Sequence, residues 1–199
     1  QSSEMTAAAP APAPAKAAPL LNLLALGNVV VGMGAFVVIG IVTPIAEGLN
    51  VSKAEAGQVL TAYAIAYAVL SPIGAALTGS LSRRTVLASA LILFCLGSVL
   101  SAVAWSIPVL TVSRVIVAFG AALFTPLSSG LAVAVSAPEQ RGRALARVFG
   151  GITLAQVVGV PLGAWLAYRF GWHSTFWTVA GLAAATALVL LKTVPRDVS

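Results

Sequence analysis

The chain has 199 residues, of which 59% are hydrophobic and 8% are charged, and its formal net charge is +6. Soluble domains carry roughly 25% charged residues, so this chain has too few polar side chains to cover the surface of a soluble fold. The composition therefore excludes a soluble domain and predicts a protein whose surface meets a lipid bilayer.

The basic residues and the single cysteine exclude further classes. Lysines and arginines are spread over short segments between apolar stretches, so they form no patch for nucleic acid, and nucleic acid is not expected as a partner. Cys95 is the only cysteine, which excludes a disulfide framework within the chain and a thiolate metal cluster. The sequence contains no phosphate-binding loop and no cluster of metal ligands, so we expect neither a metal site nor a cofactor.

At the amino end, residues 1–19 are predicted to form a disordered cytoplasmic tail. Alanine and proline make up most of this segment, and such a composition cannot build a packed core. Gln1 to Glu4, which precede Met5, are interpreted as a remnant of cloning.

Six apolar stretches follow, each close to the roughly 20 residues that a helix needs to cross a bilayer. They are expected at 20–46, 55–80, 84–104, 108–136, 143–168 and 174–194. We therefore predict an all-α membrane protein, with a six-helix transmembrane domain over residues 20–194 and a second cytoplasmic tail over residues 195–199.

The basic residues between these stretches predict the orientation, because cytoplasmic loops are enriched in lysine and arginine. One set of segments contains Lys16, Arg83, Arg84, Arg141, Arg143, Arg147, Lys192 and Arg196. The other set contains only Lys53 and Arg169. Both termini are therefore expected in the cytoplasm of a protein integral to the plasma (inner) membrane.

The tryptophans are consistent with this orientation. Trp105, Trp165, Trp172 and Trp177 all fall toward the predicted outer ends of their helices. Indole rings prefer the headgroup layer, so we expect these four side chains to form an outer aromatic belt.

A short pattern occurs twice along the chain. Pro72-Ile73-Gly74-Ala75 in the second stretch is matched by Pro161-Leu162-Gly163-Ala164 in the fifth, and Thr43-Pro44 in the first is matched by Thr125-Pro126 in the fourth. This pattern indicates that three helices repeat as a second three. An odd number of spans per repeat inverts the second copy, so we predict a 3+3 inverted repeat of the kind found in many secondary transporters.

Four segments resemble motifs of the major facilitator superfamily, in its drug and sugar efflux branch. The loop from Gly79 to Arg84 resembles that family's glycine, leucine and arginine signature, and Leu110 to Ala122 resembles the segment that carries an arginine, here Arg114. Gly150 to Gly163 resembles the glycine and proline motif of antiporters, and Gly171 to Phe176 resembles the entry into the sixth helix. The resemblance covers nearly all of residues 20–194.

The chain also departs from the family pattern. The aspartate and second glycine expected after Leu81 are missing, and Gly159 and Pro161 are separated by Val160 instead of being adjacent. Carriers of the family have two six-helix halves related by an axis along the membrane normal. This sequence resembles the amino-terminal half alone, or a stand-alone half-size member.

The resemblance implies a secondary transporter that exports a small amphipathic or sugar-like molecule by alternating access. Besides the lipid bilayer and the substrate, the implied partner is a second six-helix unit, either a second copy in a homodimer or a complementary half. Whether the chain is a natural half-size protein or a truncated carrier stays open. The alternative from another class is a non-transporting membrane subunit that assembles or regulates another membrane protein.

An enzyme is not expected, because His173 and Ser128, the pair that a serine protease would need, are predicted near opposite ends of the bundle.

Candidate substrate-binding residues are polar side chains within the helices that line the cavity in the family. Arg114 is the only charge well inside a predicted span. The free-energy cost of placing it there must be offset, either because Arg114 faces a cavity or because its side chain snorkels to the outer headgroups. Tyr63 and Tyr67 are four residues apart and so share a helix face. Asn28 and Gln156 are further lining candidates, with contacts between packed helices as the equally weighted alternative.

A second group of residues is predicted to serve gating and packing. It comprises Gly79, Arg83, Arg84, Gly159, Pro161 and Gly163, joined by Gly150 and Gly151. Glycines let another helix approach closely and proline permits a bend, as a carrier that rocks requires. Three phenylalanines, at positions 36, 119 and 149, are interpreted as packing residues rather than as cavity lining.

Overall fold

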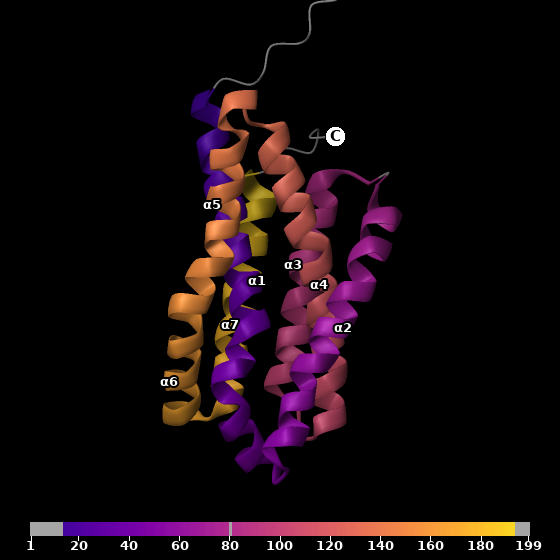
Figure 1. Ribbon diagram of the computed structural model, residues 1–199, viewed down its shortest axis with the longest axis vertical. Coiled ribbons are helices and arrows are strands. Elements are labelled where there is room, and N and C mark those ends of the chain that lie inside the picture. Colours follow the sequence, from indigo (N-terminus) through magenta and orange to yellow (C-terminus); the bar gives the residue numbers. More distant parts are fainter. Residues whose placement is uncertain (1–13, 80, 194–199) are drawn as a thin grey trace, which may run out of the picture.

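The computed structural model describes residues 14–79 and 81–193 as a bundle of long helices (Figure 1). The elements are α1 (Pro14–Leu49), α2 (Lys53–Thr78), α3 (Arg83–Ala102), α4 (Ile107–Ala134), η1 (Pro138–Gln140), α5 (Arg141–Leu154), the π-helical η2 (Ala155–Gly159), α6 (Val160–Phe170) and α7 (Trp172–Thr193). Residues 1–13 of the predicted amino-terminal tail and the whole tail predicted over 195–199 lie outside the described residues.

Six of the described segments are long and apolar enough to cross a membrane, which confirms the predicted all-α membrane fold. The fifth span consists of α5, η2 and α6 in one continuous helical path. Most boundaries lie within a few residues of the prediction, although α1 begins at Pro14 rather than at Leu20. In Figure 1 α1 and α4 run in opposite directions, as a 3+3 inverted repeat requires.

The short connections between the spans are set by local sequence. Ser52 and Glu55 form a capping box at the start of α2, in which each side chain accepts a hydrogen bond from the other residue's backbone N–H. Gly171 separates α6 from α7 with φ at +86°, a conformation that glycine adopts without steric cost. Such tight connections keep successive spans antiparallel.

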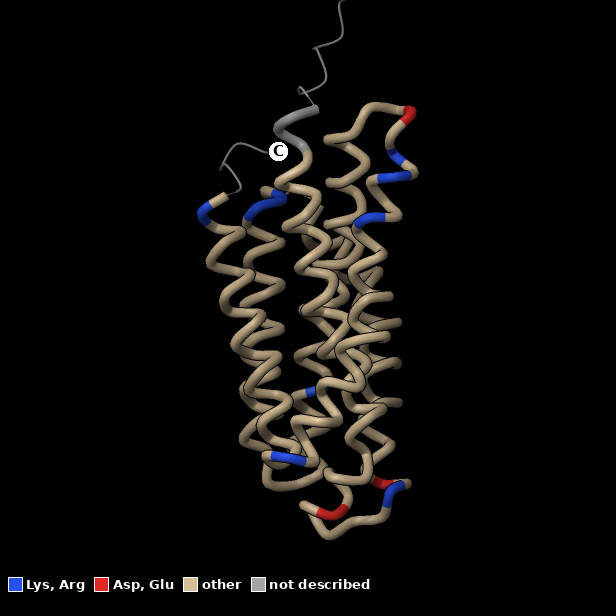
Figure 2. The backbone as a smooth tube through the Cα atoms, turned by 90° about the vertical axis from the view of Figure 1, so that its left-hand side faces the viewer, with Lys and Arg blue, Asp and Glu red and all other residues tan. Residues whose placement is uncertain are grey.

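Charged residues gather at the two ends of the bundle (Figure 2). The start of α1 and the end of α7 lie at the same end (Figure 1). The starts of α3 and α5 lie at this end as well (Figure 1). We call it the basic end, because these helix termini contain Arg83, Arg84, Arg141, Arg143, Arg147 and Lys192. The opposite end contains the α1–α2 connection and the start of α7.

The aromatic belt is only partly as predicted. Trp105, Trp165 and Trp177 are exposed, but Trp172 is 3% exposed. Trp172 is the first residue of α7, and its indole packs against Gly48 of α1 and edge-on against the Phe176 ring. The sequence predicted at which end of its helix Trp172 lies, but it did not predict whether the side chain faces lipid or protein.

Candidate functional site

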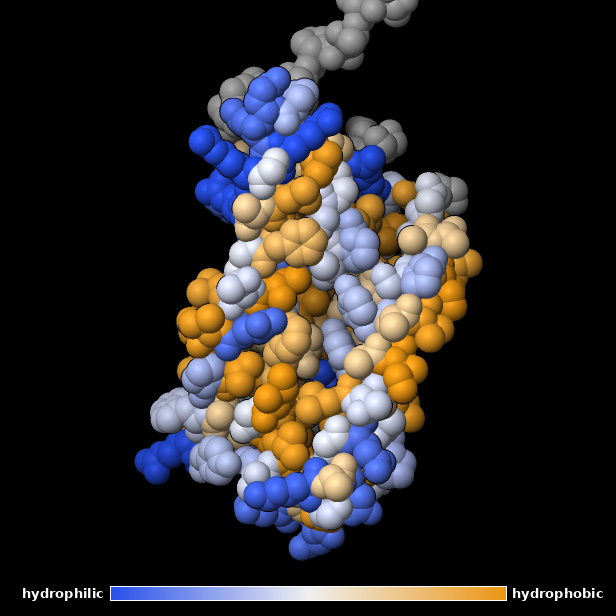
Figure 3. Space-filling model, viewed as in Figure 1, coloured by the Kyte–Doolittle hydropathy of each residue, from blue (hydrophilic) through white to orange (hydrophobic). Residues whose placement is uncertain are grey.

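A cavity of about 460 Å³ opens between four of the six spans. Its wall is formed by Val31, Gly32, Ala35, Phe36, Ile39, Leu60, Tyr63, Ala64, Tyr67, Thr125 and Ile152, which belong to α1, α2, α4 and α5. Hydrophobic side chains cover much of the outer face of these helices between the two hydrophilic ends (Figure 3). Most of the side chains that line the cavity are apolar, and Tyr63, Tyr67 and Thr125 add hydroxyl groups. This combination is the usual character of a small-molecule site.

Two tyrosines of α2 form the aromatic part of the wall. The rings of Tyr63 and Tyr67 are stacked, with 6.2 Å between centroids and 22° between planes. They share one face of α2, as their spacing predicts, and that face borders the cavity. Stacked aromatic rings offer a flat apolar surface, while each phenol keeps a hydroxyl for hydrogen bonding.

Arg114 of α4 lies directly behind Tyr63 and is only 1% exposed. Its Nη2 donates hydrogen bonds to the carbonyl oxygens of Gly34, at 2.6 Å, and Ala35, at 3.3 Å. The guanidinium carbon lies 4.8 Å from the centre of the Tyr63 ring and 6.0 Å from that of Phe176. Arg114 therefore does not snorkel to the outer headgroups; two carbonyls and two aromatic faces offset the cost of burying it.

The charge of Arg114 has no described counter-ion beside it. The acidic residues of the described chain, Glu47, Glu55 and Glu139, all lie at or near helix ends. The Nε–H of Arg114 is buried and has no hydrogen-bond partner among the described residues. Arg114 does not itself line the cavity. Its uncompensated positive charge lies one layer behind the Tyr63 ring, where it attracts an electron-rich group of a ligand through the aromatic wall.

Asn28 is fully buried and connects α1 to α4. Its Nδ2 donates to the carbonyl oxygen of Leu24 at 3.0 Å and to Ser128 Oγ at 2.9 Å. Asn28 is not among the residues that line the cavity. Its position matches the helix-contact alternative, in which uncharged polar groups join packed membrane helices.

Gln156 lies in η2, where the fifth span leaves regular α-helical geometry. The N–H of Val160 bonds to the carbonyl oxygen of Ala155, five residues earlier, and Pro161 has no N–H to continue the α-helical ladder. Gln156 is exposed and lies one turn beyond Ile152, a residue of the cavity wall. It does not itself line the cavity.

The glycines of the fifth span differ in what they contact. A Cβ added at Gly159 would meet the Met33 side chain at 2.6 Å, and one added at Gly163 or Gly151 would overlap Val37 or the Ala25 carbonyl of α1. Gly150 has open space around it, so no described helix of this chain packs closely against it. Pro161 is exposed at the start of α6.

Much of the cavity wall was not predicted from the sequence. Phe36 lines the cavity although it was interpreted as a packing residue, and Thr125 lines it next to Pro126, which lies inside α4. The repeated Thr-Pro pair is the one signal that could have identified Thr125. Apolar lining residues such as Ile39 carry no comparable signal, because they have the same character as lipid-facing ones.

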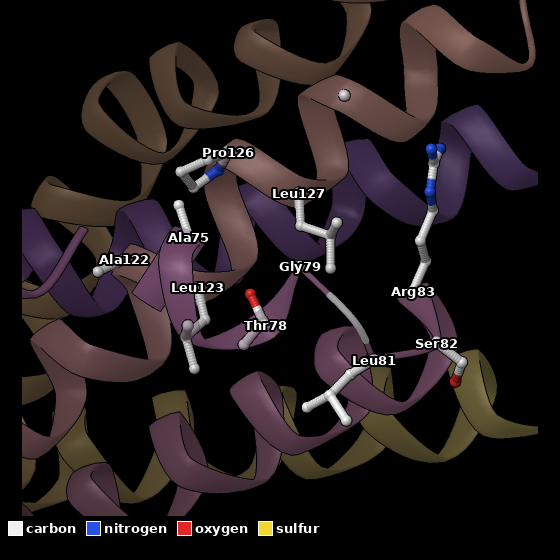
Figure 4. Close-up of a pocket in the computed structure, with 11 residues that line it drawn as sticks. Ala75, Thr78, Gly79, Leu81, Ser82, Arg83, Ala122, Leu123, Pro126 and Leu127 are labelled. Carbon is white, nitrogen blue, oxygen red and sulfur yellow. The ribbon is translucent and has the colours of Figure 1, made fainter. Parts of the chain in front are cut away.

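A second, larger pocket of about 690 Å³ lies at the basic end (Figure 4). In Figure 4 it is surrounded by side chains from α2 and α4 and by the connection into α3. Its lining consists of Ala75, Thr78, Gly79, Leu81, Ser82, Arg83, Ala122, Leu123, Pro126, Leu127 and Gly130. Gly79 and Arg83, both predicted to serve gating, therefore meet at one site.

Arg84, the neighbour of Arg83, does not line this pocket. Its Nη2 donates a hydrogen bond to the carbonyl oxygen of Leu191, near the end of α7. A basic side chain at this position satisfies a carbonyl that the helix itself leaves unpaired. The two adjacent arginines thus serve different faces of the bundle.

Comparisons with known proteins identify a protein family and several solved structures of similar fold. A family model described as Major Facilitator Superfamily matches residues 24–199. The solved structures of similar fold include a bacterial homolog of the human lysosomal transporter Spinster, in an inward-facing conformation, with 20% identity and a TM-score of 0.81. They also include the proton:xylose symporter XylE bound to 6-bromo-6-deoxy-D-glucose, with 19% identity and a TM-score of 0.81.

A peptide transporter, POT, in complex with alafosfalin is similar at 17% identity with a TM-score of 0.76. Each of these matches covers 92% of this chain. The chain spans 44% of the Spinster homolog, 46% of XylE and 39% of POT. At these identities the solved structures establish the fold, over less than half of each relative.

Proposed function

The chain belongs to the major facilitator superfamily, and from that premise we propose that it forms one half of a secondary active transporter. The transporter works by alternating access and exports a small amphipathic or sugar-like molecule from the cell. The membrane is the plasma (inner) membrane, with the basic end in the cytoplasm, since lysine and arginine favour that side.

The one-sided cavity is the observation that carries this proposal. Its wall combines an apolar surface with the Tyr63 and Tyr67 rings and, one layer behind, the uncompensated charge of Arg114. An amphipathic solute matches both parts of such a wall. A non-transporting subunit has no need of a cavity of this kind, so the cavity supports transport over that alternative.

The same geometry supports pairing with a second six-helix unit. In the most apolar stretch of α2, 17% of the residues are buried, and in that of the fifth span 22% are buried. The corresponding share for α1 is 67%. These two poorly buried spans flank the cavity. A second unit, either another copy of this chain or a complementary half, would close the cavity across a two-fold axis along the membrane normal.

Cysteine cross-linking tests the pairing. In a Cys95→Ala background, Gln156→Cys should form a cross-linked product with the second unit in native membranes, because Gln156 is exposed beside the cavity. Leu96→Cys is the matched control, since Leu96 is 59% exposed but lies on α3, which does not line the cavity. A product with twice the mass of the chain indicates a homodimer, and another mass indicates a complementary half. Equal cross-linking of both variants, or of neither, contradicts pairing through this face.

Accessibility to a thiol reagent tests orientation and alternating access together. In the same background, Ser106→Cys in the α3–α4 connection should react with an impermeant reagent from outside, and Gln140→Cys should react only from the cytoplasm. With these as references, Ala64→Cys in the cavity wall should react from both sides in turn, as the two conformations exchange. Reversed labelling of the references would overturn the orientation, and an Ala64→Cys variant that is unreactive from both sides would overturn alternating access.

A further inference from the structure

A groove of about 460 Å³ lies between α3 and α7 at the basic end. It is lined by Ser82, Arg84, Thr85, Ala88, Ser89, Ile92 and Leu191. None of these residues lines the cavity between α1, α2, α4 and α5. A second unit that closes the cavity would therefore leave this groove facing lipid.

The lining of the groove changes character with depth. Arg84, Ser82 and Thr85 lie at the start of α3, where the span begins. Ile92 is about 12 Å further along the helix, at 1.5 Å per residue. The groove thus has a cationic, hydroxyl-rich rim at the level of the lipid headgroups and a mainly apolar floor in the hydrocarbon layer.

The rim retains hydrogen-bond donors that no described residue uses. A guanidinium has five N–H groups, and the hydrogen bond to the Leu191 carbonyl fixes Arg84 while using one of them. The Ser82 and Thr85 hydroxyl oxygens lie 2.7 Å apart, so one hydroxyl donates to the other and the second proton stays free. A fixed guanidinium beside a free hydroxyl is well suited to bind a phosphate group.

We propose that this groove binds an anionic phospholipid. The phosphate lies against Arg84 and the Ser82–Thr85 pair, and one acyl chain follows Ala88 and Ile92. The other basic residues of this end favour an anionic headgroup over a zwitterionic one, because each contributes to a positive surface potential. The bound lipid joins α3 to α7 at the end where Arg84 already connects them. This proposal does not depend on transport.

The test is lipid binding to the purified chain of 199 residues, measured by native mass spectrometry and by the melting temperature. Phosphatidylglycerol should stay bound and raise the melting temperature, whereas phosphatidylcholine should do neither. Glycerol phosphate, which has the anionic headgroup without acyl chains, should bind at least about tenfold more weakly than phosphatidylglycerol because it leaves the apolar floor empty. Equal effects of phosphatidylglycerol and phosphatidylcholine would overturn the proposal, and so would equal binding of glycerol phosphate.

Two neighbouring arginines provide a matched pair of variants. Arg84→Gln should weaken phosphatidylglycerol binding about tenfold, as expected for the loss of a charged hydrogen-bond partner. Arg83→Gln should leave binding within about twofold, since Arg83 lines the other pocket. Equal losses in both variants would indicate diffuse attraction to the basic end and would contradict a site in the groove.

Because Arg84→Gln also removes the hydrogen bond to α7, a third variant separates binding from folding. Ser89 is exposed and lies in the groove, so Ser89→Trp should fill the groove while Arg84 keeps its bond to Leu191. Lipid binding should fall in this variant although the lipid-free melting temperature does not. Unchanged binding in Ser89→Trp would overturn the proposal.

Discussion

Replacing Arg114 with lysine is expected to lower the initial rate of transport about tenfold or more in proteoliposomes, for any compound that the unmodified protein transports. The guanidinium contacts two carbonyl oxygens of α1 and the faces of Tyr63 and Phe176 at the same time. An ammonium group is a compact point charge without a planar fork, so it cannot keep both sets of contacts. Losing one hydrogen bond of a charged group costs about 1.5–3 kcal/mol, which corresponds to a factor of roughly 10–100.

An Arg114→Met variant separates the charge from the packing. Arg114 has no counter-ion among the described residues, so methionine of similar volume removes a costly buried charge and leaves no opposite charge unpaired. This variant should therefore remain monodisperse with an unchanged melting temperature. Its transport should nevertheless be lost, because no cation remains behind Tyr63. Transport at the normal rate in either variant would show that Arg114 has only a structural role.

Replacing Gly151 with alanine is expected to destabilise the protein, although the same change at Gly150 should be neutral or stabilising. A methyl group on Gly151 would overlap the Ala25 carbonyl oxygen and lie 3.1 Å from the Val29 nitrogen, whereas one on Gly150 meets nothing within 4 Å. Overpacking a tight contact costs about 1–3 kcal/mol. Alanine is otherwise the better helix former by about 1 kcal/mol, so the two changes should have opposite signs.

The melting temperatures of the two purified variants in detergent provide the measurement. Gly151→Leu should extend the trend to a large loss of folded protein, because a longer side chain pushes α5 away from α1. If the Gly150 and Gly151 variants have equal melting temperatures, the close approach of α5 to α1 is absent in solution.

The spans could be predicted from the sequence because a bilayer imposes a minimum length on any apolar helix. The positions of polar residues along each helix followed directly, which is why Arg114 could be recognised as a buried charge. What each polar group contacts could not be predicted, since partners lie far apart in the chain: Asn28 and Ser128 are 100 residues apart. Three-dimensional packing decides between a cavity and a helix contact, and polarity alone does not.

The rotation of side chains around a helix explains why neighbouring residues of one motif make different contacts. Arg83 and Arg84 are adjacent in sequence, yet one lines the pocket beside α4 and the other reaches α7. Successive residues of an α-helix point about 100° apart, so neighbours at a helix start serve different surfaces. The same reason places Gly151 against α1 and leaves Gly150 open. A motif read as one unit can therefore contain residues with separate roles.

The π-helical segment of the fifth span also affects how this chain is aligned with its relatives. One extra residue in the turn from Ala155 to Gly159 shifts everything beyond it by about 100° relative to a straight helix. An alignment without a gap that matches this span to an unbroken helix will therefore place either α5 or α6 on the wrong face. Evolutionary comparisons of this span should allow a single-residue insertion at Ala155–Gly159, so that Gly151 and Gly163 are both compared with residues that face α1.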